Sequence, residues 1–340
     1  MVVLFHLAGM EKEFGGGERL LPRLAESGRA GVDLFFVVSG FIMVTVTAGA
    51  GRGLRSAGEF LYHRATRIYP IYWFYTAALI GIHALIPAAF DPARWNSVSI
   101  PRSLLLVPQQ GLPVLVVGWT MVHEIYFYLV FSLILFAPER SRQWLLGAWL
   151  TALVALPALF PEVAASGAAP AFALITHPLT VEFIAGAAIG VLVRRGLFVP
   201  GRTVFAAGAL LLLICYAGLA PQAGAWPEGW SRVLIFGLPS ALLLYGAVSM
   251  EFAGGRLLPR ALGTVGDASY SISLVQIFPL LALGRVWSWV RVPGLADNAI
   301  ALTLTGCAIV AAGLLSYHML ERPSLALARG IRKRRVPRES

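Results

Sequence analysis

The chain has 340 residues, of which 58% are hydrophobic and only 13% are charged, and its formal net charge is +10. Soluble domains average about 25% charged residues, so this composition excludes an ordinary soluble protein and predicts an integral membrane protein. The apolar segments leave no room for a sizeable domain outside the membrane. The two cysteines, Cys215 and Cys307, lie within apolar segments, and the spacing typical of a zinc site does not occur. Neither a disulfide framework nor a metal site is therefore predicted.

Ten apolar segments follow one another along the chain and predict an all-α, polytopic bundle of about ten transmembrane helices. A helix that crosses a membrane needs roughly 20 apolar residues, and nine of the segments are long enough. The segments are 1–9, 31–48, 67–89, 113–137, 144–160, 170–193, 203–220, 231–250, 264–290 and 296–319. The first is about half a helix, which would leave backbone groups unpaired in hydrocarbon. We therefore expect this helix to be truncated and its start codon to lie upstream.

The distribution of basic residues predicts the orientation of the chain. If the C-terminus is cytoplasmic and ten segments alternate, most of the 27 Lys and Arg residues fall on the cytoplasmic side, as the positive-inside rule requires. Both termini are then cytoplasmic. We expect a single transmembrane domain over residues 1–325 and a basic cytoplasmic tail over 326–340. The tail is expected to contact anionic lipids, and no nucleic-acid partner is expected.

His6 and Asp33 form the first candidate site. His6 lies near the predicted outer end of the first segment, and Asp33 lies a few residues inside the outer end of the second. Alone, either residue could be structural. Because consecutive helices place them at similar depth, however, the carboxylate could fix the imidazole tautomer and raise its basicity, which is the arrangement of a general base.

Glu124 is a carboxylate near the middle of an apolar segment, about ten residues or 15 Å from its outer end. An ionisable residue near the bilayer centre costs roughly 2.5–3.5 kcal/mol on insertion scales, so a function is the default expectation. A structural ion pair or hydrogen bond between helices is the alternative. Trp119, five residues earlier, is either an interfacial anchor or a wall of the site. His123 receives no role, because it points about 100° away from Glu124 around the helix.

Arg64 and Arg67 lie at the predicted inner end of the third segment, and they share one face if the helix begins there. Topology alone could explain these arginines. Paired guanidinium groups would also suit a phosphorylated cytosolic ligand, since Arg binds phosphate bidentately. Tyr69, in the same stretch, and Glu321, which closes the last segment, are assigned substrate-binding or structural roles.

Other features are interpreted as structural. His83 and His177 face loops or helix ends, and residues 186–190 form a small-xxx-small pattern typical of helix packing. The chain contains neither a phosphate-binding Walker loop nor the nucleophile elbow of serine hydrolases.

Several stretches, taken together and in this order, closely resemble the acyltransferase 3 family of membrane O-acyltransferases. They are Val3-Leu4-Phe5-His6, Gly31-Val32-Asp33-Leu34-Phe35-Phe36-Val37-Val38-Ser39-Gly40-Phe41, Arg64-Ala65-Thr66-Arg67-Ile68-Tyr69-Pro70, Gly118-Trp119-Thr120 with Glu124, Gly266-Asp267-Ala268-Ser269-Tyr270-Ser271 and Glu321-Arg322-Pro323. The variant between Gly118 and Tyr128 is most similar to the exopolysaccharide-acetylating branch. The resemblance covers essentially the whole chain.

The resemblance implies an enzyme of the bacterial inner membrane that takes an acyl group, expected to be acetyl, from cytosolic acyl-CoA. No permanently bound cofactor is implied. The acceptor is a glycan or a lipid-linked sugar, so the expected partners are acyl-CoA, this acceptor and membrane lipids. The motif histidine corresponds to His6, the Arg-x-x-Arg pair to Arg64 and Arg67, and the motif carboxylates to Asp33, Glu124 and Glu321.

The chain departs from the family pattern in two places. An arginine usually lies about ten residues before the motif histidine, which here would precede Met1, and Gln276 stands where a histidine is frequent. We expect His6 to deprotonate the acceptor hydroxyl or to carry the acyl group itself, and Glu124 to orient the thioester or the acceptor.

Two other classes of protein remain open. A proton-coupled transporter or flippase could use the same buried His and carboxylates as a relay, although no inverted repeat is evident. A purely structural partner in polysaccharide export would leave Glu124 unexplained. The acceptor sugar, the acyl group and self-association into a homo-oligomer stay open at this level.

Overall fold

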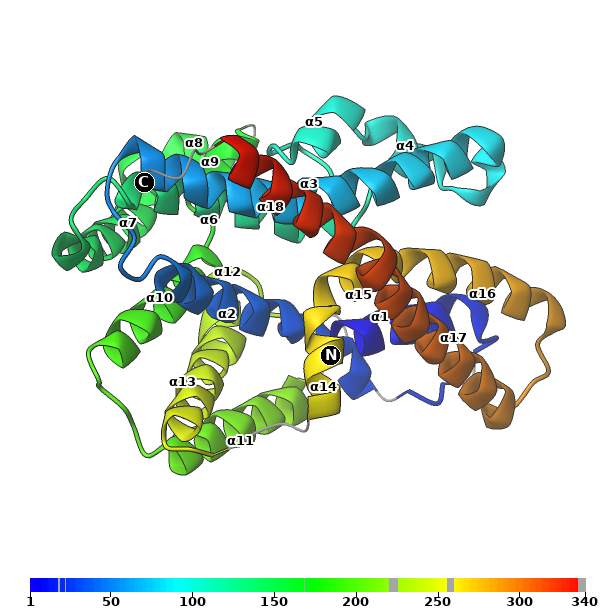
Figure 1. Ribbon diagram of the computed structural model, residues 1–340. Coiled ribbons are helices and arrows are strands. Elements are labelled where there is room, and N and C mark those ends of the chain that lie inside the picture. The colour runs from blue at the N-terminus through cyan, green and yellow to red at the C-terminus, as the bar shows by residue number, and fades with distance from the viewer. Residues whose placement is uncertain (18, 22, 168, 220–225, 256–259, 336–340) are drawn as a thin grey trace. The chain divides into compact units, whose positions relative to one another are not determined.

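The computed structural model describes residues 1–340 except 18, 22, 168, 220–225, 256–259 and 336–340. Within this part of the chain every regular element is a helix, which confirms the all-α prediction (Figure 1). The α-helices are α1 (Val2–Phe14), α2 (Gly31–Val46), α3 (Leu54–Leu85), α4 (Pro92–Ser97), α5 (Ile100–Leu105), α6 (Gly118–Ile134), α7 (Glu139–Leu159), α8 (Pro161–Ser166), α9 (Pro170–Ile175), α10 (Thr180–Arg194), α11 (Gly201–Leu219), α12 (Gly229–Arg232), α13 (Leu238–Phe252), α14 (Arg260–Asp267), α15 (Ser269–Val275), α16 (Ile277–Val290), α17 (Leu295–Ser316) and α18 (Arg322–Arg335). Two 3₁₀ helices, η1 (Arg23–Ala30) and η2 (Pro87–Ala89), and two π-helices, η3 (Val233–Gly237) and η4 (Tyr317–Glu321), complete the set.

Among the described residues, seven helical stretches are long and apolar enough to cross a membrane. The bent pair α15–α16 makes an eighth if it counts as one span. These eight coincide with eight of the ten predicted segments. The other two segments form α1, with 13 residues, and α6, with 17 residues. The chain is thus a multi-pass helical membrane protein, whereas a count of about ten spans stays a prediction.

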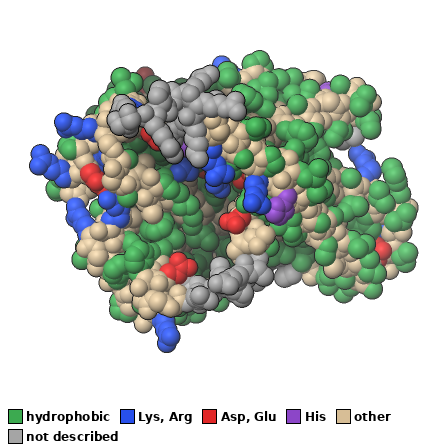
Figure 2. Space-filling view, in the orientation of Figure 1, with side chains coloured by type: hydrophobic (Ala, Val, Ile, Leu, Met, Phe, Trp, Pro, Cys, Tyr) green, Lys and Arg blue, Asp and Glu red, His purple; other side chains and the backbone are tan. Residues whose placement is uncertain are grey.

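The surface agrees with a lipid environment. Hydrophobic side chains cover much of the face that Figure 2 shows. Large apolar residues such as Leu133, Leu213 and Trp289 are more than 60% exposed. An apolar surface of this extent needs an apolar solvent, because soluble proteins rarely expose contiguous apolar patches beyond a few hundred Å².

Helix α3 begins much earlier than its apolar segment. The segment predicted near residue 67 starts where the arginines end, but the helical backbone already begins at Leu54. Arg64 and Arg67 therefore lie inside a continuous helix, three residues apart, which places both on one face as predicted.

The chain divides into two compact units. The first unit comprises Met1–Phe5, Pro22–Leu61 and Val122–Pro259, and the second comprises His6–Leu21, Tyr62–Met121 and Arg260–Ser340. The predicted domain 1–325 and its basic tail stay a prediction, and residues 336–340 of that tail lie outside the described residues.

In the first unit, α2 packs along α10 and α11 packs along α13. Glycines permit the close approach of α2 and α10. A Cβ atom at Gly186 would lie 1.8 Å from the carbonyl oxygen of Val37, and one at Gly40 would lie 1.9 Å from that of Phe183. The predicted small-residue pattern at 186–190 is thus confirmed as a helix-packing surface.

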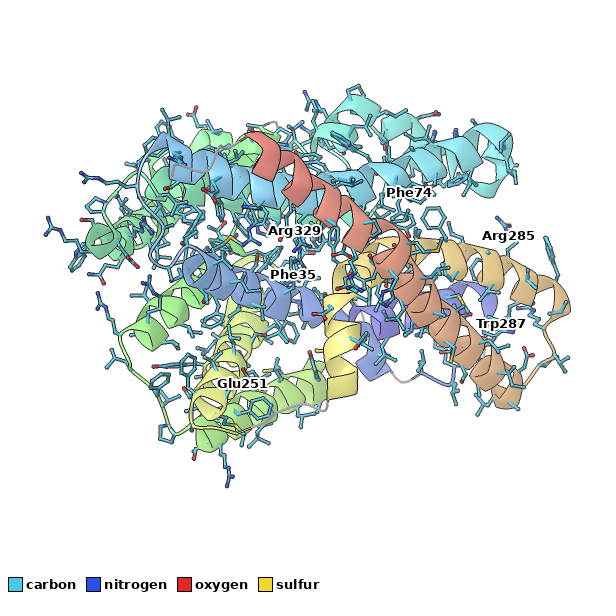
Figure 3. All side chains as sticks on the ribbon, viewed as in Figure 1. Phe35, Phe74, Glu251, Arg285, Trp287 and Arg329 are labelled. Atoms are coloured by element: carbon cyan, nitrogen blue, oxygen red, sulfur yellow. The ribbon has the colours of Figure 1, made fainter. Side chains whose placement is uncertain are left out.

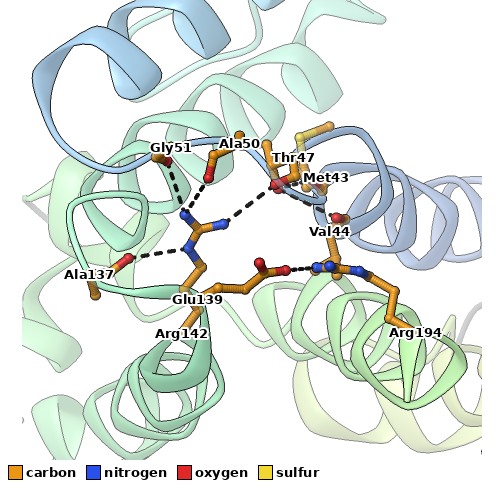
Figure 4. Close-up of polar contacts among 9 residues, drawn as sticks. All are labelled: Met43, Val44, Thr47, Ala50, Gly51, Ala137, Glu139, Arg142 and Arg194. Atoms are coloured by element: carbon orange, nitrogen blue, oxygen red, sulfur yellow. Dashed lines mark hydrogen bonds and ion pairs between the residues drawn. The ribbon is translucent and has the colours of Figure 1, made fainter. Parts of the chain in front are cut away.

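Connections that were predicted to share the cytoplasmic side meet at one end of the first unit. The Arg142 guanidinium lies between them (Figure 4). It donates hydrogen bonds to the backbone carbonyl groups of Thr47, Ala50, Gly51 and Ala137. Glu139, at the start of α7, forms an ion pair with Arg194, at the end of α10. The alternation of the segments places the end of α2, the start of α7 and the end of α10 on one side of the membrane, and in the first unit these three ends lie together. That this side is cytoplasmic stays a prediction.

In the second unit, α17 packs along α15 and α16. Buried Glu11 of α1 accepts hydrogen bonds from the backbone N–H groups of Leu20 and Leu21 and from the amide of Asn298 on α17. These contacts satisfy a buried carboxylate and join α1 and the turn after it to α17.

Candidate functional site

The start of α2 carries a fully buried carboxylate that is paired with an arginine. Asp33 is 0% exposed, and its two oxygens accept hydrogen bonds from Nε and Nη2 of Arg232 at 2.8 and 2.9 Å. A bidentate guanidinium–carboxylate pair is among the strongest polar contacts in proteins. Arg232 lies at the end of α12, directly before the π-helix η3, and it is 199 residues from Asp33 in the sequence.

A second carboxyl group, that of Glu182, lies against this pair. Glu182 is in the first turn of α10, is 1% exposed, and is close enough to interact electrostatically with both Asp33 and Arg232. A Cβ atom at Gly237 would lie 2.7 Å from its Oε1, so the side chain occupies space that only glycine leaves open at that point of η3. π-Helical turns occur frequently at functional sites.

Two histidines lie near the same group. The rings of His123, on α6, and His177, just before α10, are 4.7 Å apart between centroids, and both are within electrostatic range of Arg232. The backbone N–H of Leu179 donates to Nδ1 of His177 at 3.3 Å. In a neutral His177 the proton is therefore on Nε2.

Four members of this cluster were not predicted as site residues. His123 received no role and His177 was interpreted as structural, yet the fold brings them together. Glu182 was not considered, although the insertion cost that singled out Glu124 applies equally to a carboxylate within segment 170–193. Arg232 received no role in a site either. Asp33, Glu182, Arg232, His123 and His177 together are called the acid–histidine cluster.

Glu124 is also buried in the first unit, with 6% of its surface exposed. Its carboxylate accepts a hydrogen bond from the hydroxyl of Tyr128, one turn later on α6. The Tyr128 ring in turn packs edge-on against Phe60. This contact holds the carboxylate against its own helix, and a catalytic or orienting role for Glu124 stays a prediction.

The predicted pairing of His6 with Asp33 also stays a prediction. His6, on α1, belongs to the second unit and Asp33 to the first. The partner that the structure shows for Asp33 is Arg232. No signal in the sequence pointed to this partner, because the distance along the chain is long and the arginine lies at a segment end, where topology already accounts for it.

The second unit brings three of the predicted motif stretches together. Ser271 on α15 donates a hydrogen bond of 2.6 Å to Glu321, which is 1% exposed and ends the π-helix η4. The positive charge of Arg67 on α3 acts on the same carboxylate. The hydroxyl of Tyr270 donates to the backbone carbonyl of Ile68 at 2.8 Å and so joins α15 to α3. Arg67, Ser271 and Glu321 thus form one polar group, called here the arginine–glutamate group.

The remaining predicted residues lie in the same unit. Half-buried Arg64 precedes Arg67 on α3 by one turn. The hydroxyl of Tyr69 donates to the carbonyl of Leu105 at 3.1 Å, which is a structural contact with α5. Trp119 lies half-buried at the start of α6. Gln276, which stands where a histidine is frequent, is 1% exposed at the 44° bend between α15 and α16.

Among the described residues, no group of three His, Cys, Asp or Glu side chains is arranged to hold a metal ion. The polar groups described above are carboxyl, imidazole, hydroxyl and guanidinium groups. Such groups can transfer protons, bind anions and donate hydrogen bonds to oxygen atoms.

Comparison with known proteins defines the class to which this chain belongs. The sequence profile described as an acyltransferase domain, that of the acyltransferase 3 family, matches residues 1–318. The chain is therefore a member of the acyltransferase 3 family, which confirms the resemblance drawn from the motif stretches.

One relative shows the same similarity over nearly the full length. The chain is 31% identical over 325 residues to the exopolysaccharide production protein ExoZ of Rhizobium meliloti (strain 1021), and the match covers 90% of this chain and 92% of that protein. No solved structure matches the chain.

Proposed function

We propose that this protein is a membrane O-acyltransferase that transfers an acyl group, in the first instance acetyl, from cytosolic acyl-CoA. The acceptor is a hydroxyl group of an exopolysaccharide sugar or of its lipid-linked precursor, and the enzyme acts in the bacterial inner membrane with both termini cytoplasmic. The family match over residues 1–318 supports acyl transfer. The similarity to a protein named for exopolysaccharide production supports the class of acceptor.

The arginine–glutamate group is the observation that supports acyl-CoA as the donor. Arg64 and Arg67 present two guanidinium groups from one face of α3, in the N-terminal half of the helix, which the charge distribution assigns to the cytoplasmic side. Guanidinium groups bind phosphate bidentately, and CoA carries several phosphate groups. Buried Glu321 and its donor Ser271 hold α15 and η4 beside this face. CoA bound here would be free to exchange with the cytosol.

The reaction itself requires a base and a path for one proton. The hydroxyl oxygen of the acceptor attacks the thioester carbonyl carbon, the carbon–sulfur bond breaks, and the hydroxyl proton ends on the sulfur of the released CoA. His6 is the proposed base for the hydroxyl proton, with Asp33 and Glu124 as the proposed acidic members of the site. General acid–base help of this kind is typically worth 10²–10⁴-fold in rate.

Acyl content of the exopolysaccharide tests this function. A strain that lacks the gene is complemented with the wild-type chain, with His6→Ala or with Glu251→Gln, a control at an exposed position near the end of α13 (Figure 3). Wild type and control should restore O-acyl groups to the polysaccharide, and His6→Ala should not. Full restoration by His6→Ala at equal expression would contradict the assignment of the base.

A proton-coupled transporter or flippase is the second candidate. The observation in its favour is the acid–histidine cluster, because ionisable residues within membrane segments are typical of proton relays. The two functions differ in what they need. A transporter moves its sugar substrate in response to a pH gradient without acyl-CoA and loses this movement on Glu124→Gln, whereas the acyltransferase forms a covalent product only when acyl-CoA is supplied.

A further inference from the structure

The acid–histidine cluster contains more negative than positive groups at its centre. Asp33 and Glu182 are 0% and 1% exposed, and the guanidinium of Arg232 is the cation that contacts Asp33 directly. A buried carboxylate without a compensating charge is so costly that such a group takes up a proton instead. One guanidinium compensates one carboxylate, so the second carboxyl group must be neutral or must find another cation.

The hydrogen bonds identify which carboxyl group is neutral. Both oxygens of Asp33 accept from Arg232, which is the bidentate geometry of a guanidinium–carboxylate ion pair. Both oxygens of Glu182 are buried, and neither accepts a hydrogen bond from a described residue. An ionised carboxylate needs donors, whereas a protonated one carries a donor of its own that Asp33, beside it, can accept. These contacts favour Glu182 over Asp33 as the group that carries the proton.

The other charged groups that the structure describes leave this balance, one guanidinium for two buried carboxyl groups, unchanged. Arg29 and Glu228, which carry opposite charges, both interact electrostatically with Arg232. Other titratable or charged groups lie on the elements that pack around α10: His123 on α6, His177 before α10, Tyr216 on α11, Glu251 at the far end of α13, and Glu139, Arg142 and Arg194 at the far end of α7 and α10. Arg194 lies 12 residues along α10 from Glu182, and Glu251 lies 14 residues along the helical stretch from Gly237, which is roughly 18–21 Å. Glu139 pairs with Arg194, and Arg142 binds backbone carbonyl groups at that same end of the unit.

We propose that Glu182 is a buried neutral carboxylic acid that shares its proton with Asp33, and that this proton is exchanged during turnover. Arg232 pairs with Asp33, and Asp33 accepts the hydrogen bond that the Glu182 proton donates. The first part rests on the burial of both carboxyl groups and on the hydrogen bonds around them. The second part rests on the proposed function, in which the acceptor hydroxyl loses a proton and the CoA sulfur gains one.

Infrared spectroscopy tests the first part without any assay of activity. The purified full-length protein in detergent at neutral pH should show a carboxylic-acid C=O stretch that shifts in D₂O. Glu182→Gln should abolish this band, and the exposed control Glu251→Gln should leave it unchanged. Absence of the band in the wild type, or its persistence in Glu182→Gln, would overturn the proposal.

A second variant provides an independent check in case Glu182→Gln does not fold. In Asp33→Asn the buried carboxyl group left beside Arg232 is that of Glu182, which should then ionise and pair with the guanidinium. The band should therefore disappear in Asp33→Asn although Glu182 is intact. A band that survives Asp33→Asn would show that Glu182 is protonated for a reason other than the shared proton.

Turnover tests the second part. The amide that Glu182→Gln introduces can still donate to Asp33, so this variant should fold, but it cannot exchange a proton. We expect at least a tenfold lower kcat with an unchanged KM for acetyl-CoA. An unchanged kcat, with the infrared result as predicted, would show that the proton is held but not used. If the wild-type protein itself transferred no acyl group, this would instead contradict the proposed function.

Discussion

The ion pair of Asp33 and Arg232 lies at the centre of a buried group of charged and titratable side chains in the first unit. Two buried carboxyl groups and two histidines are all within range of one guanidinium. A buried ion pair is weak evidence for stability by itself, since desolvation offsets much of the attraction. Removing one partner is a different matter, because the other partner then remains buried without compensation.

Arg232→Ala should therefore destabilise the protein strongly. Breaking a buried pair typically costs about 3–5 kcal/mol, and the thermal unfolding midpoint of the detergent-solubilised protein measures this. Arg202→Ala, which removes an exposed arginine at the start of α11 in the same unit, is the matched control. Asp33→Asn combined with Arg232→Gln should recover part of the loss. Equal midpoints for Arg232→Ala and the control would refute a structural role for the pair.

In the second unit, the hydroxyl of Ser271 supports the buried carboxylate of Glu321. Ser271→Ala removes a hydrogen bond to a charged group, which typically contributes about 1.5–3 kcal/mol. We expect a lower thermal midpoint for Ser271→Ala. Adding Glu321→Gln to this variant should lower the midpoint by less than Glu321→Gln lowers it alone, because the two residues act as one unit. If the two losses simply add, then the two side chains are not coupled in the way that the 2.6 Å contact implies.

Candidate site residues were recognisable from the sequence where an ionisable side chain interrupts or borders an apolar segment. His6, Asp33, Glu124, Arg64, Arg67 and Glu321 all stand out as costly or paired groups in or beside apolar segments. Contacts between distant parts of the chain could not be predicted. Nothing local indicates that Arg232 pairs with Asp33, or that His123 and His177 meet, since these depend on how α2, α6, α10 and α12 pack.

At the level of helices, close backbone contact holds α2 against α10. The glycine pattern at 186–190 was predictable because small residues at four-residue spacing are typical of such contacts in membranes. The identity of the partner helix was not predictable. The contact also matters for the site, because Asp33 lies on α2 and Glu182 lies on α10, each in the first turn.

Gly186→Leu should separate these two helices. Its Cβ would lie within 1.8 Å of the Val37 carbonyl oxygen, so the helices must move apart or the protein must fail to fold. The folded yield, measured as the monodisperse fraction in size-exclusion chromatography, should fall sharply. Gly147→Leu on α7, where an added Cβ meets nothing within 4 Å, should give a wild-type yield. Similar yields for both variants would contradict the packing of α2 on α10.

Helix α3 carries the predicted acyl-CoA site, and the two arginines on one of its faces can be tested by substitution. Arg64→Gln and Arg67→Gln should raise the KM for acetyl-CoA roughly tenfold or more, because each removes a charged contact to phosphate worth about 1.5–3 kcal/mol. Arg55→Gln, at the exposed start of the same helix, is the control. If Arg67→Gln lowers only stability and leaves the KM unchanged, then its role is confined to the interaction with Glu321.

For the chain as a whole, composition and hydropathy were sufficient to predict the class of fold. Every apolar segment predicted from the sequence overlaps a helix, and the end of α2, the start of α7 and the end of α10 meet at one end of the first unit, which agrees with alternating segments. The lengths of the helices were less predictable. The polar start of α3 is helical although it lies outside the apolar segment, and α6 is shorter than its apolar segment. Hydropathy records where a helix meets lipid, whereas the backbone continues beyond that boundary.

The proposed chemistry likewise combines two kinds of evidence. The motif stretches and the family match assign acyl transfer, and the packing shows which of the motif residues contact one another. The family assignment alone would have missed Glu182 and Arg232, which no motif stretch contains. The geometry alone would not have indicated acyl transfer rather than proton-coupled transport.

Transfer of a labelled acetyl group tests the proposed enzymatic activity itself. Purified protein reconstituted in vesicles with an exopolysaccharide acceptor, or its lipid-linked precursor, is supplied with acetyl-CoA labelled in the acetyl group. We predict label in the glycan as an alkali-labile ester for the wild type and for Glu251→Gln, and at least 10²-fold less for His6→Ala. An unlabelled glycan after incubation of the folded wild-type protein with acetyl-CoA and acceptor would contradict acyl transfer by this protein.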